Sequence, residues 1–234
     1  MSSPASVSTE MPVGVLGRLA NGVCRRAFSS PEAFAYEATI APALAKLVEP
    51  VILATVGGGR CLDVGSGGGL IALATSRDGP ASEIGIDPSQ SQVGRFARRR
   101  RAGDTAWVIQ ARAEALPFSR NSFDSLYSSC TWKHWPDPDA GVAECVRVTR
   151  AGGPIVIVEI DGTSTEEEIR RFAQGSRIPL GLREAYVRFA MRTVVGVAPD
   201  SAALAASFGG LPVSTPTISR LGGWPFLVAS TIAD

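Results

Sequence analysis

The stretch from Cys61 to Leu70, CLDVGSGGGL, holds four glycines and one acid within ten residues, directly after a hydrophobic segment. Glycine has no Cβ, so a ligand or a neighbouring segment can approach its backbone closely. The stretch therefore predicts a glycine loop between a strand and a helix. The rest of the chain has to decide whether that loop holds a dinucleotide, a phosphate or a different cofactor, or makes only a tight turn.

Segments typical of strands alternate with segments typical of helices around this loop. The expected strands are residues 60–65, 83–87, 106–111, 123–129 and 154–160. Helices are expected between these strands at residues 70–76, 89–101 and 138–148. This alternation is typical of parallel βαβ units, and runs at 216–221 and 225–233 predict a closing hairpin. We expect an α/β fold: a Rossmann-like seven-stranded, mostly parallel sheet with helices on both faces and a C-terminal antiparallel hairpin.

Length and composition predict one domain. The chain has 234 residues, of which 45% are hydrophobic and 19% charged, which is enough for a sizeable core. Residues 1–12 read as a flexible tail and 13–234 as a single domain. Two helical parts of that domain, residues 13–56 (with helices at 13–28 and 34–56) and 162–208, are expected to form a lid over the substrate. Thr165 and Glu168 have the spacing of a capping box at the start of the second part.

Several protein classes are disfavoured by charge and patterning. The net charge of +1 gives no reason to expect nucleic acid, and the arginine-rich run 95–101 reads as a solvated helix face. Residues 39–56 are interrupted by Lys46, Glu49 and Pro50, so no membrane span is expected. The four cysteines form no CxxC pair and read as buried free thiols, and no metal site is expected. Together with a start that lacks signal-peptide features, this predicts a soluble cytoplasmic protein.

The acids around the loop indicate the kind of ligand. Asp87 ends the second expected strand, 22 residues beyond Gly65, where a carboxylate can accept both hydroxyls of a ribose. Asp63 stands at the mouth of the loop and would repel a pyrophosphate, but it suits a cofactor with a cationic amine and sulfonium. The loop has no lysine, which excludes a P-loop. Leu70 occupies the third glycine position of a dinucleotide fingerprint, and the register that starts at Gly67 fails as well.

The motifs together carry a family resemblance. LDVGSGGG, GIDPS, ARAEALPFSRNSFDSLYSS, HWPDPDAGVAECVRVTRAGG and IVIVEID occur in this order. The segment from Arg60 to Asp161 resembles class I S-adenosylmethionine-dependent methyltransferases, and most of all the small-molecule group that includes the quinone-biosynthesis C-methyltransferases. The resemblance implies S-adenosyl-L-methionine as cofactor and a small-molecule methyl acceptor. A homodimer is one assembly that it leaves open.

The resemblance also implies which residues contact the cofactor. They are Asp63, Gly65, Ser66, Gly67, Gly69, Asp87, Pro88, Ser89, Ala113, Glu114, Ser128 and Ser129. Asp63 would bind the amine and Asp87 the ribose, with helix capping as the plainer role for each. Arg112 departs from the family, which usually has an aspartate there that accepts a hydrogen bond from the adenine amine. An arginine has no acceptor, so that bond is lost or moves to a backbone carbonyl or to Glu114.

The acceptor side is less defined by the sequence. His134 is the single histidine and the obvious candidate for a general base, although packing is its commoner role in the family. Trp132, Phe172 and Tyr186 are candidates for the acceptor wall, and they predict an apolar or aromatic acceptor unless they only pack the lid. Methyl transfer from a sulfonium is an in-line displacement that needs alignment more than a base.

The leading hypothesis is therefore methyl transfer from S-adenosylmethionine to a small acceptor. The alternative is a binding or regulatory protein that kept the fold but does not catalyse methyl transfer. Arg112 and the lack of an obvious general base support this alternative. A nicotinamide-dependent oxidoreductase would rest on the glycine loop alone and fails on its spacing.

Overall fold

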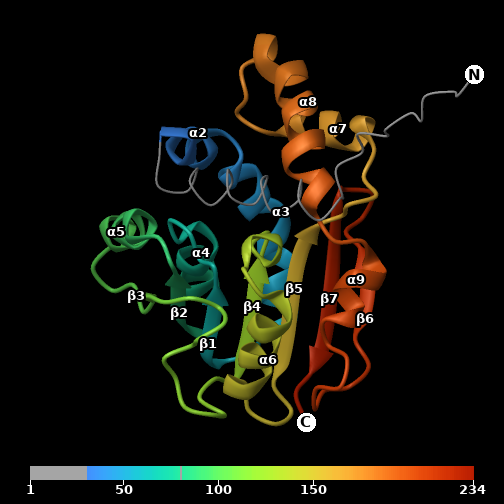
Figure 1. Ribbon diagram of the computed structural model, residues 1–234. Helices are drawn as coiled ribbons and strands as arrows, with labels where there is room; N and C mark the ends of the chain where they lie inside the picture. The colour runs from blue at the N-terminus through green and yellow to red at the C-terminus, as the bar shows by residue number, and fades with distance from the viewer. Residues whose placement is uncertain (1–30, 80) are drawn as a thin grey trace, which may run out of the picture.

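The computed structural model describes residues 31–79 and 81–234, so the tail expected at 1–12 and the helix expected at 13–28 lie outside the described residues. One seven-stranded sheet runs through the described chain in the order β3-β2-β1-β4-β5-β7-β6 (Figure 1). The strands are β1 (Gly59–Val64), β2 (Ala81–Asp87), β3 (Trp107–Gln110), β4 (Ser125–Ser129), β5 (Pro154–Ile160), β6 (Thr217–Arg220) and β7 (Phe226–Ile232). Only the pairings of β7 with β5 and β6 are antiparallel. The expected sheet and its closing hairpin are confirmed.

Helices cover both faces of the sheet (Figure 1). The helices are α2 (Pro31–Thr39), α3 (Ala41–Thr55), α4 (Leu70–Asp78), α5 (Gln90–Arg99), α6 (Pro138–Val148), α7 (Glu166–Gly175), α8 (Arg183–Thr193) and α9 (Ser201–Ala206). Three short 3₁₀ turns are η1 (Trp132–His134), η2 (Leu180–Leu182) and η3 (Val195–Val197). The predicted helix 34–56 is two helices, because Pro42 lies in the first turn of α3, where its missing N–H costs no hydrogen bond and favours a new start.

The interior strand β5 shows how the sheet is buried on both faces. Val156 and Val158 belong to the core cluster that contains α3 side chains. Ile155 and Ile157 belong to the cluster on the opposite face, with Val142 of α6. All four strand residues are fully buried, and each such side chain contributes about 1.5–3 kcal/mol by leaving water. The continuous apolar run of β5 is thus the sequence signature of a doubly covered strand.

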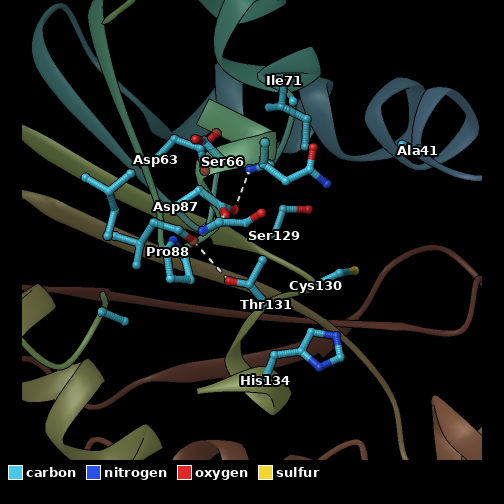
Figure 2. A pocket seen from close by; sticks show the side chains of 18 of the residues that line it. Ala41, Asp63, Ser66, Ile71, Asp87, Pro88, Ser129, Cys130, Thr131 and His134 are labelled. Carbon is cyan, nitrogen blue, oxygen red and sulfur yellow. Dashed lines mark hydrogen bonds between the residues drawn. The ribbon is translucent and has the colours of Figure 1, made fainter. Parts of the chain in front are cut away.

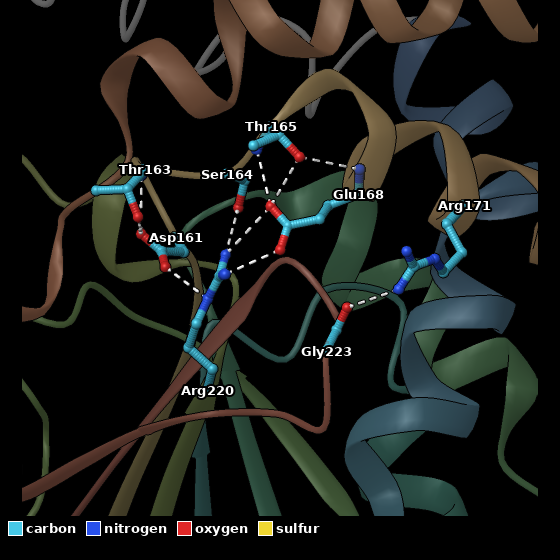
Figure 3. Close-up of polar contacts among 8 residues, drawn as sticks. All are labelled: Asp161, Thr163, Ser164, Thr165, Glu168, Arg171, Arg220 and Gly223. Carbon is cyan, nitrogen blue, oxygen red and sulfur yellow. Dashed lines mark hydrogen bonds and ion pairs between the residues drawn. The ribbon is translucent and has the colours of Figure 1, made fainter.

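The base of the 162–208 segment is fixed to the hairpin by ion pairs (Figure 3). The predicted capping box of Thr165 and Glu168 is confirmed at the start of α7. Arg220 of β6 pairs with the Asp161 carboxylate at 2.9 Å and with Glu168 at 2.8 Å. Arg171 of α7 donates to the Gly223 carbonyl of the hairpin turn at 3.4 Å. The hairpin therefore holds the first helix of this segment in place.

Candidate active site

A cavity of about 330 Å³ opens at the carboxyl ends of the parallel strands. Its walls come from α2, the start of α3, the loop after β1, the start of α5, residues 112–114 and the segment after β4. Asp63, Ser66 and Asp87 gather on one side of it, while Cys130 and His134 lie on the other (Figure 2). In open α/β sheets, ligands bind at this end of the strands, so the cavity is the candidate site.

The glycine loop at residues 65–69 is bound to the neighbouring strand. The N–H groups of Gly65 and Ser66 both donate to the Ile86 carbonyl of β2, at 2.9 and 2.8 Å. Gly65 has a φ of +84°, and a Cβ there would collide with the Thr131 side chain. Only glycine can adopt this positive φ and also fit against Thr131 at low cost. The loop therefore stays close to the sheet and leaves the cavity open.

Asp87 connects the glycine loop to helix α5. Its Oδ2 accepts from the Gly67 N–H at 3.0 Å, and its Oδ1 accepts from the Ser89 N–H at 2.8 Å. Burial raises the pKa of Asp87 to about 6, although these two donors oppose the shift. A carboxylate offers about four lone-pair positions, so two remain for hydroxyl donors in the cavity. By position Ser89 is the N-cap of α5, and Asp87 stabilises the turn before it.

Asp63 lies deeper than Asp87 at the end of β1. It lines the cavity but is only 2% exposed. Burial, and next the nearby Glu83 carboxylate, raise the pKa of Asp63 well above its usual range. A buried acid of this kind favours a cationic partner, because the partner restores the stabilisation that the anion loses on leaving water. Asp63 is therefore suited to an ammonium or sulfonium group.

Glu37 and Arg99 bind the backbone of the glycine loop, and neither was predicted as a site residue. Glu37 of α2 lines the cavity and accepts from the Gly68 N–H at 3.3 Å. The Arg99 guanidinium of α5 donates to Glu37 at 2.7 Å and to the Gly68 carbonyl at 2.8 Å. The expectation that the run 95–101 is a solvated face is thus wrong for Arg99. The sequence holds no local signal that distinguishes Glu37 from Glu32 of the same helix.

The segment after β4 forms the opposite wall. Cys130 has a φ of +57°, a rare conformation for a residue with a side chain and one that is typical of functional sites. Burial raises the pKa of the Cys130 thiol to about 12, so it is neutral at ordinary pH. Thr131 Oγ1 lies 3.0 Å from the Val64 carbonyl and 2.8 Å from the Ser128 hydroxyl. These bonds fix the wall relative to β1.

His134 lies in the η1 turn of this wall. Burial, and next the Lys133 ammonium, lower the pKa of His134 well below its usual range, so the imidazole is neutral at pH 7. Lys133 points away into the core and pairs with Glu159 of β5 at 2.7 Å, with both side chains at most 3% exposed. Lys133 also donates to the Cys130 carbonyl at 2.8 Å. The buried ion pair therefore supports the backbone that carries Cys130 and His134.

The cavity brings together most of the residues predicted as site residues, but not all. Those that line it are Asp63, Gly65, Ser66, Gly67, Asp87, Pro88, Ser89, Ala113, Glu114, Ser129 and His134. Those that do not line it are Gly69, Ser128, Trp132, Phe172 and Tyr186. Gly69 is the N-cap of α4 and packs on Phe96. Phe172 and Tyr186 contribute to the core beneath α7 and α8.

Arg112, the departure from the family pattern, also lines the cavity. Its backbone forms an isolated bridge with Ala115, and its side chain is exposed. Glu114 accepts from the Asp137 N–H at 3.3 Å, which uses one of its oxygens outside the cavity. Both residues therefore line the cavity, and Arg112 occupies the position at which the family that the sequence resembles has an aspartate.

The structure describes three of the four cysteines. Cys61, Cys130 and Cys145 are free thiols, whereas Cys24 lies outside the described residues. No helix within residues 31–79 and 81–234 is long and apolar enough to cross a membrane.

Comparison with known proteins gives a consistent result. Residues 62–157 match the family described as a methyltransferase domain. The chain is 36% identical over 95 residues to the rice 2-methyl-6-phytyl-1,4-hydroquinone methyltransferase 2, covering 40% of this chain and 27% of that protein. It is 35% identical over 103 residues to the ubiquinone biosynthesis O-methyltransferase of Methylococcus capsulatus, covering 43% of each. The chain thus spans well under two thirds of these relatives.

A solved structure extends the comparison to the whole fold. The plantazolicin methyltransferase BpumL, in complex with a desmethyl-plantazolicin analogue and S-adenosylhomocysteine, superposes with a TM-score of 0.73 over 95% of this chain and 97% of that one. The sequence identity is 13%, so this likeness concerns the fold. The fold is therefore the one found in solved S-adenosylmethionine-dependent methyltransferases. Residues 62–157, less than half of the chain, are those that match the methyltransferase-domain family, and the sequence likeness over that part is to quinone-biosynthesis methyltransferases.

Proposed function

We propose that this chain binds S-adenosylmethionine in the 330 Å³ cavity and transfers its methyl group to a small apolar or aromatic acceptor. The observation that carries the proposal is the pair of acids at adjacent strand ends. Asp63 and Asp87 flank a glycine loop whose close approach to the sheet leaves room for a ligand. Carboxylates in this arrangement suit a ligand that has a cationic group at one place and a vicinal diol at another.

The residues present fit this cofactor. Asp87 has carboxylate lone pairs left for the ribose hydroxyls, and the open glycine backbone at Gly67 is available to the methionine part. Asp63 supplies the negative charge for the amine. Pro88 and Ser89 would lie along the adenosine side, as would Ala113 and Glu114. When bound, the cofactor supplies an activated methyl group, so the chain needs only to align an acceptor and exclude water.

The acceptor would enter between the glycine loop and the wall after β4. The lining of the cavity includes Tyr36, Leu44, Ile71 and Trp135, which are apolar or aromatic. Burial raises the pKa of the Tyr36 phenol well above its usual range, so it stays protonated and able to donate. Relatives that act on hydroquinone and ubiquinone precursors by name support a phenolic or hydroquinone acceptor. Residues 31–56 and 162–208 would together cover it.

We propose a conditional role for His134. Its neutral imidazole can take a proton from an acceptor hydroxyl, which matters only where the acceptor must lose one. With a phenolic acceptor, His134→Gln should then lower kcat by a factor of roughly 10²–10⁴ while the affinity for S-adenosylhomocysteine stays unchanged. Unchanged turnover in that variant would instead make His134 a packing residue of the wall.

A second candidate is a binding or regulatory protein that keeps the fold without turnover. Arg112 at the rim supports it, because a guanidinium has no acceptor for an adenine amine and a weaker adenosine site would follow. Under this alternative the chain binds S-adenosylhomocysteine, if at all, as a signal.

Calorimetry with S-adenosylmethionine and S-adenosylhomocysteine tests the proposal first, with Asp87→Ala as the variant and Asp124→Ala as a control at the opposite end of the sheet. Binding by the wild type and by the control, lost in Asp87→Ala, supports the cofactor site. A panel of phenols, hydroquinones and lipids then tests turnover through release of S-adenosylhomocysteine. Binding without release for the whole panel would favour the regulatory alternative, and no binding at all would reject the cofactor site.

A further inference from the structure

Three large apolar side chains stand in solvent on one short segment of the lid region. Leu180 and Leu182 of η2 are 79% and 58% exposed, and Phe189 of α8 is 55% exposed. We call residues 177–192, which carry all three, the lid tip. Ordinary surface helices expose single apolar residues, whereas a cluster of large ones on one segment indicates a surface that contacts another phase or molecule.

The same segment carries an excess of positive charge. Residues 177–192 contain four arginines and one acid, Glu184. That acid is already paired, since the Arg170 guanidinium lies 2.7 Å from it. Within the part of the chain that the structure describes, Arg177, Arg188 and Arg192 form no ion pair. The lid tip is therefore strongly basic on a chain whose net charge is only +1.

Helix α8 separates its two faces clearly. Val187 and Ala190 are buried against the core, and Tyr186 packs beside them. Arg188, Phe189 and Arg192 face outward and are exposed. A helix with apolar and arginine side chains together on its outer face is typical of segments that lie in the headgroup region of a bilayer.

The lid tip lies at the end of the molecule where the cavity opens. Figure 1 shows α8 and α2 at the same end of the sheet, beyond the carboxyl ends of the parallel strands. Tyr36 of α2 lines the cavity, and Cys130 in the cavity wall is near enough to Tyr186 of α8 to contribute to raising its pKa. A surface bound at the outer face of α8 would thus lie close to the route by which an acceptor enters.

We propose that the lid tip docks on an anionic lipid surface. Leu180, Leu182 and Phe189 would enter the headgroup boundary while Arg177, Arg188 and Arg192 bind lipid phosphates, for which a guanidinium is well matched. The charge of the segment selects this occupant, because an apolar protein groove or a second copy of this basic face would leave the arginines without partners. Docking would supply an acceptor dissolved in the bilayer, and this last consequence rests on the proposed function.

Vesicle co-sedimentation with the full chain tests the docking itself. We expect binding to phosphatidylcholine vesicles that contain phosphatidylglycerol, weak binding to phosphatidylcholine alone, and release at high salt. Arg188→Gln with Arg192→Gln should weaken binding by about fivefold for each arginine. Leu182→Ser with Phe189→Ser should weaken it at least as much.

Matched controls come from the opposite end of the sheet. Arg120 precedes β4 and is exposed, and Ile232 at the end of β7 is 41% exposed, so Arg120→Gln and Ile232→Ser should bind vesicles as the wild type does. Equal binding to neutral and anionic vesicles, or lid-tip variants that bind like the controls, would overturn the proposal. So would a concentration-dependent dimer that Phe189→Ser abolishes, which would assign the face to a second copy.

The docking and the proposed methyl transfer can be tested separately. The same variants are titrated with S-adenosylhomocysteine, to which the lid-tip changes should make no difference. Cofactor binding without vesicle binding would reject the docking alone. Vesicle binding without cofactor binding would reject the methyl transfer and leave the docking in place.

Discussion

The Glu37 carboxylate of α2 lies 2.7 Å from the Arg99 guanidinium of α5, and together they bind the N–H and the carbonyl of Gly68. Two residues that are 62 positions apart in the chain thus fix the backbone of Gly68 in the glycine loop. The glycine loop is therefore shaped by its neighbours as well as by its own sequence.

Loss of the Arg99 guanidinium should weaken the loop. In Arg99→Ala the nearly buried Glu37 carboxylate loses its cation, so we expect the free energy of unfolding to fall by about 1–3 kcal/mol. Affinity for S-adenosylhomocysteine should fall as well, because the Gly68 peptide is no longer fixed. Urea unfolding and calorimetry measure both. Arg98→Ala, one position earlier and exposed, is the control and should change the unfolding free energy by less than about 0.5 kcal/mol.

The close approach of Gly65 to Thr131 predicts a second effect. Gly65→Ala places a methyl group against the Thr131 side chain at a φ of +84°, which should cost about 1–3 kcal/mol of stability and displace the loop from the cavity. Gly57→Ala is the matched control, since nothing lies within 4 Å of a Cβ there. Equal stability of the two variants in urea would show that the loop can move aside without cost.

Cofactor affinity should depend on pH through Asp87. Its pKa is raised to about 6, so below that pH the folded apoprotein carries a proton that ribose binding must displace. The affinity for S-adenosylhomocysteine should therefore fall as the pH is lowered through 6, approaching about tenfold per pH unit. Calorimetry from pH 5 to 8 measures this.

The Asp87→Asn variant separates the contributions to that pH dependence. It should bind weakly and lose most of the slope, and any slope that remains reports the second raised acid, Asp63. If the wild type binds S-adenosylhomocysteine equally well from pH 5 to 8, the assignment of Asp87 to the ribose is contradicted.

The buried pair of Lys133 and Glu159 should be costly to break. Both side chains are at most 3% exposed, so Lys133→Met leaves an uncompensated carboxylate in the core and should cost about 3–5 kcal/mol. Adding Glu159→Leu should recover part of this loss. For comparison, Arg170→Met breaks exposed contacts with Glu184 and Glu167 and should cost less than about 1 kcal/mol. A small effect of Lys133→Met would mean that water reaches Glu159.

The sequence predicted the sheet and most of the residues that line the cavity, because those features depend on local pattern. The apolar run of β5 and the glycine loop with Asp87 each carry their information within a few residues. Glu37 and Arg99 were missed because their pairing depends on how α2 and α5 pack, which no local pattern encodes. Phe172 is placed in the core rather than at the cavity for the same reason, since helical spacing does not tell an inner face of a lid from a cavity wall.

The position of β7 has a consequence for how the chain is made. β7 is the last strand in the chain, yet it lies between β5 and β6 and pairs with β5 along its whole length. During synthesis β1 to β5 can pair while β5 still has an open edge, because β6 reaches the sheet only through β7, and unpaired strand edges favour aggregation. This domain should therefore depend on protection of the β5 edge until β7 has left the ribosome.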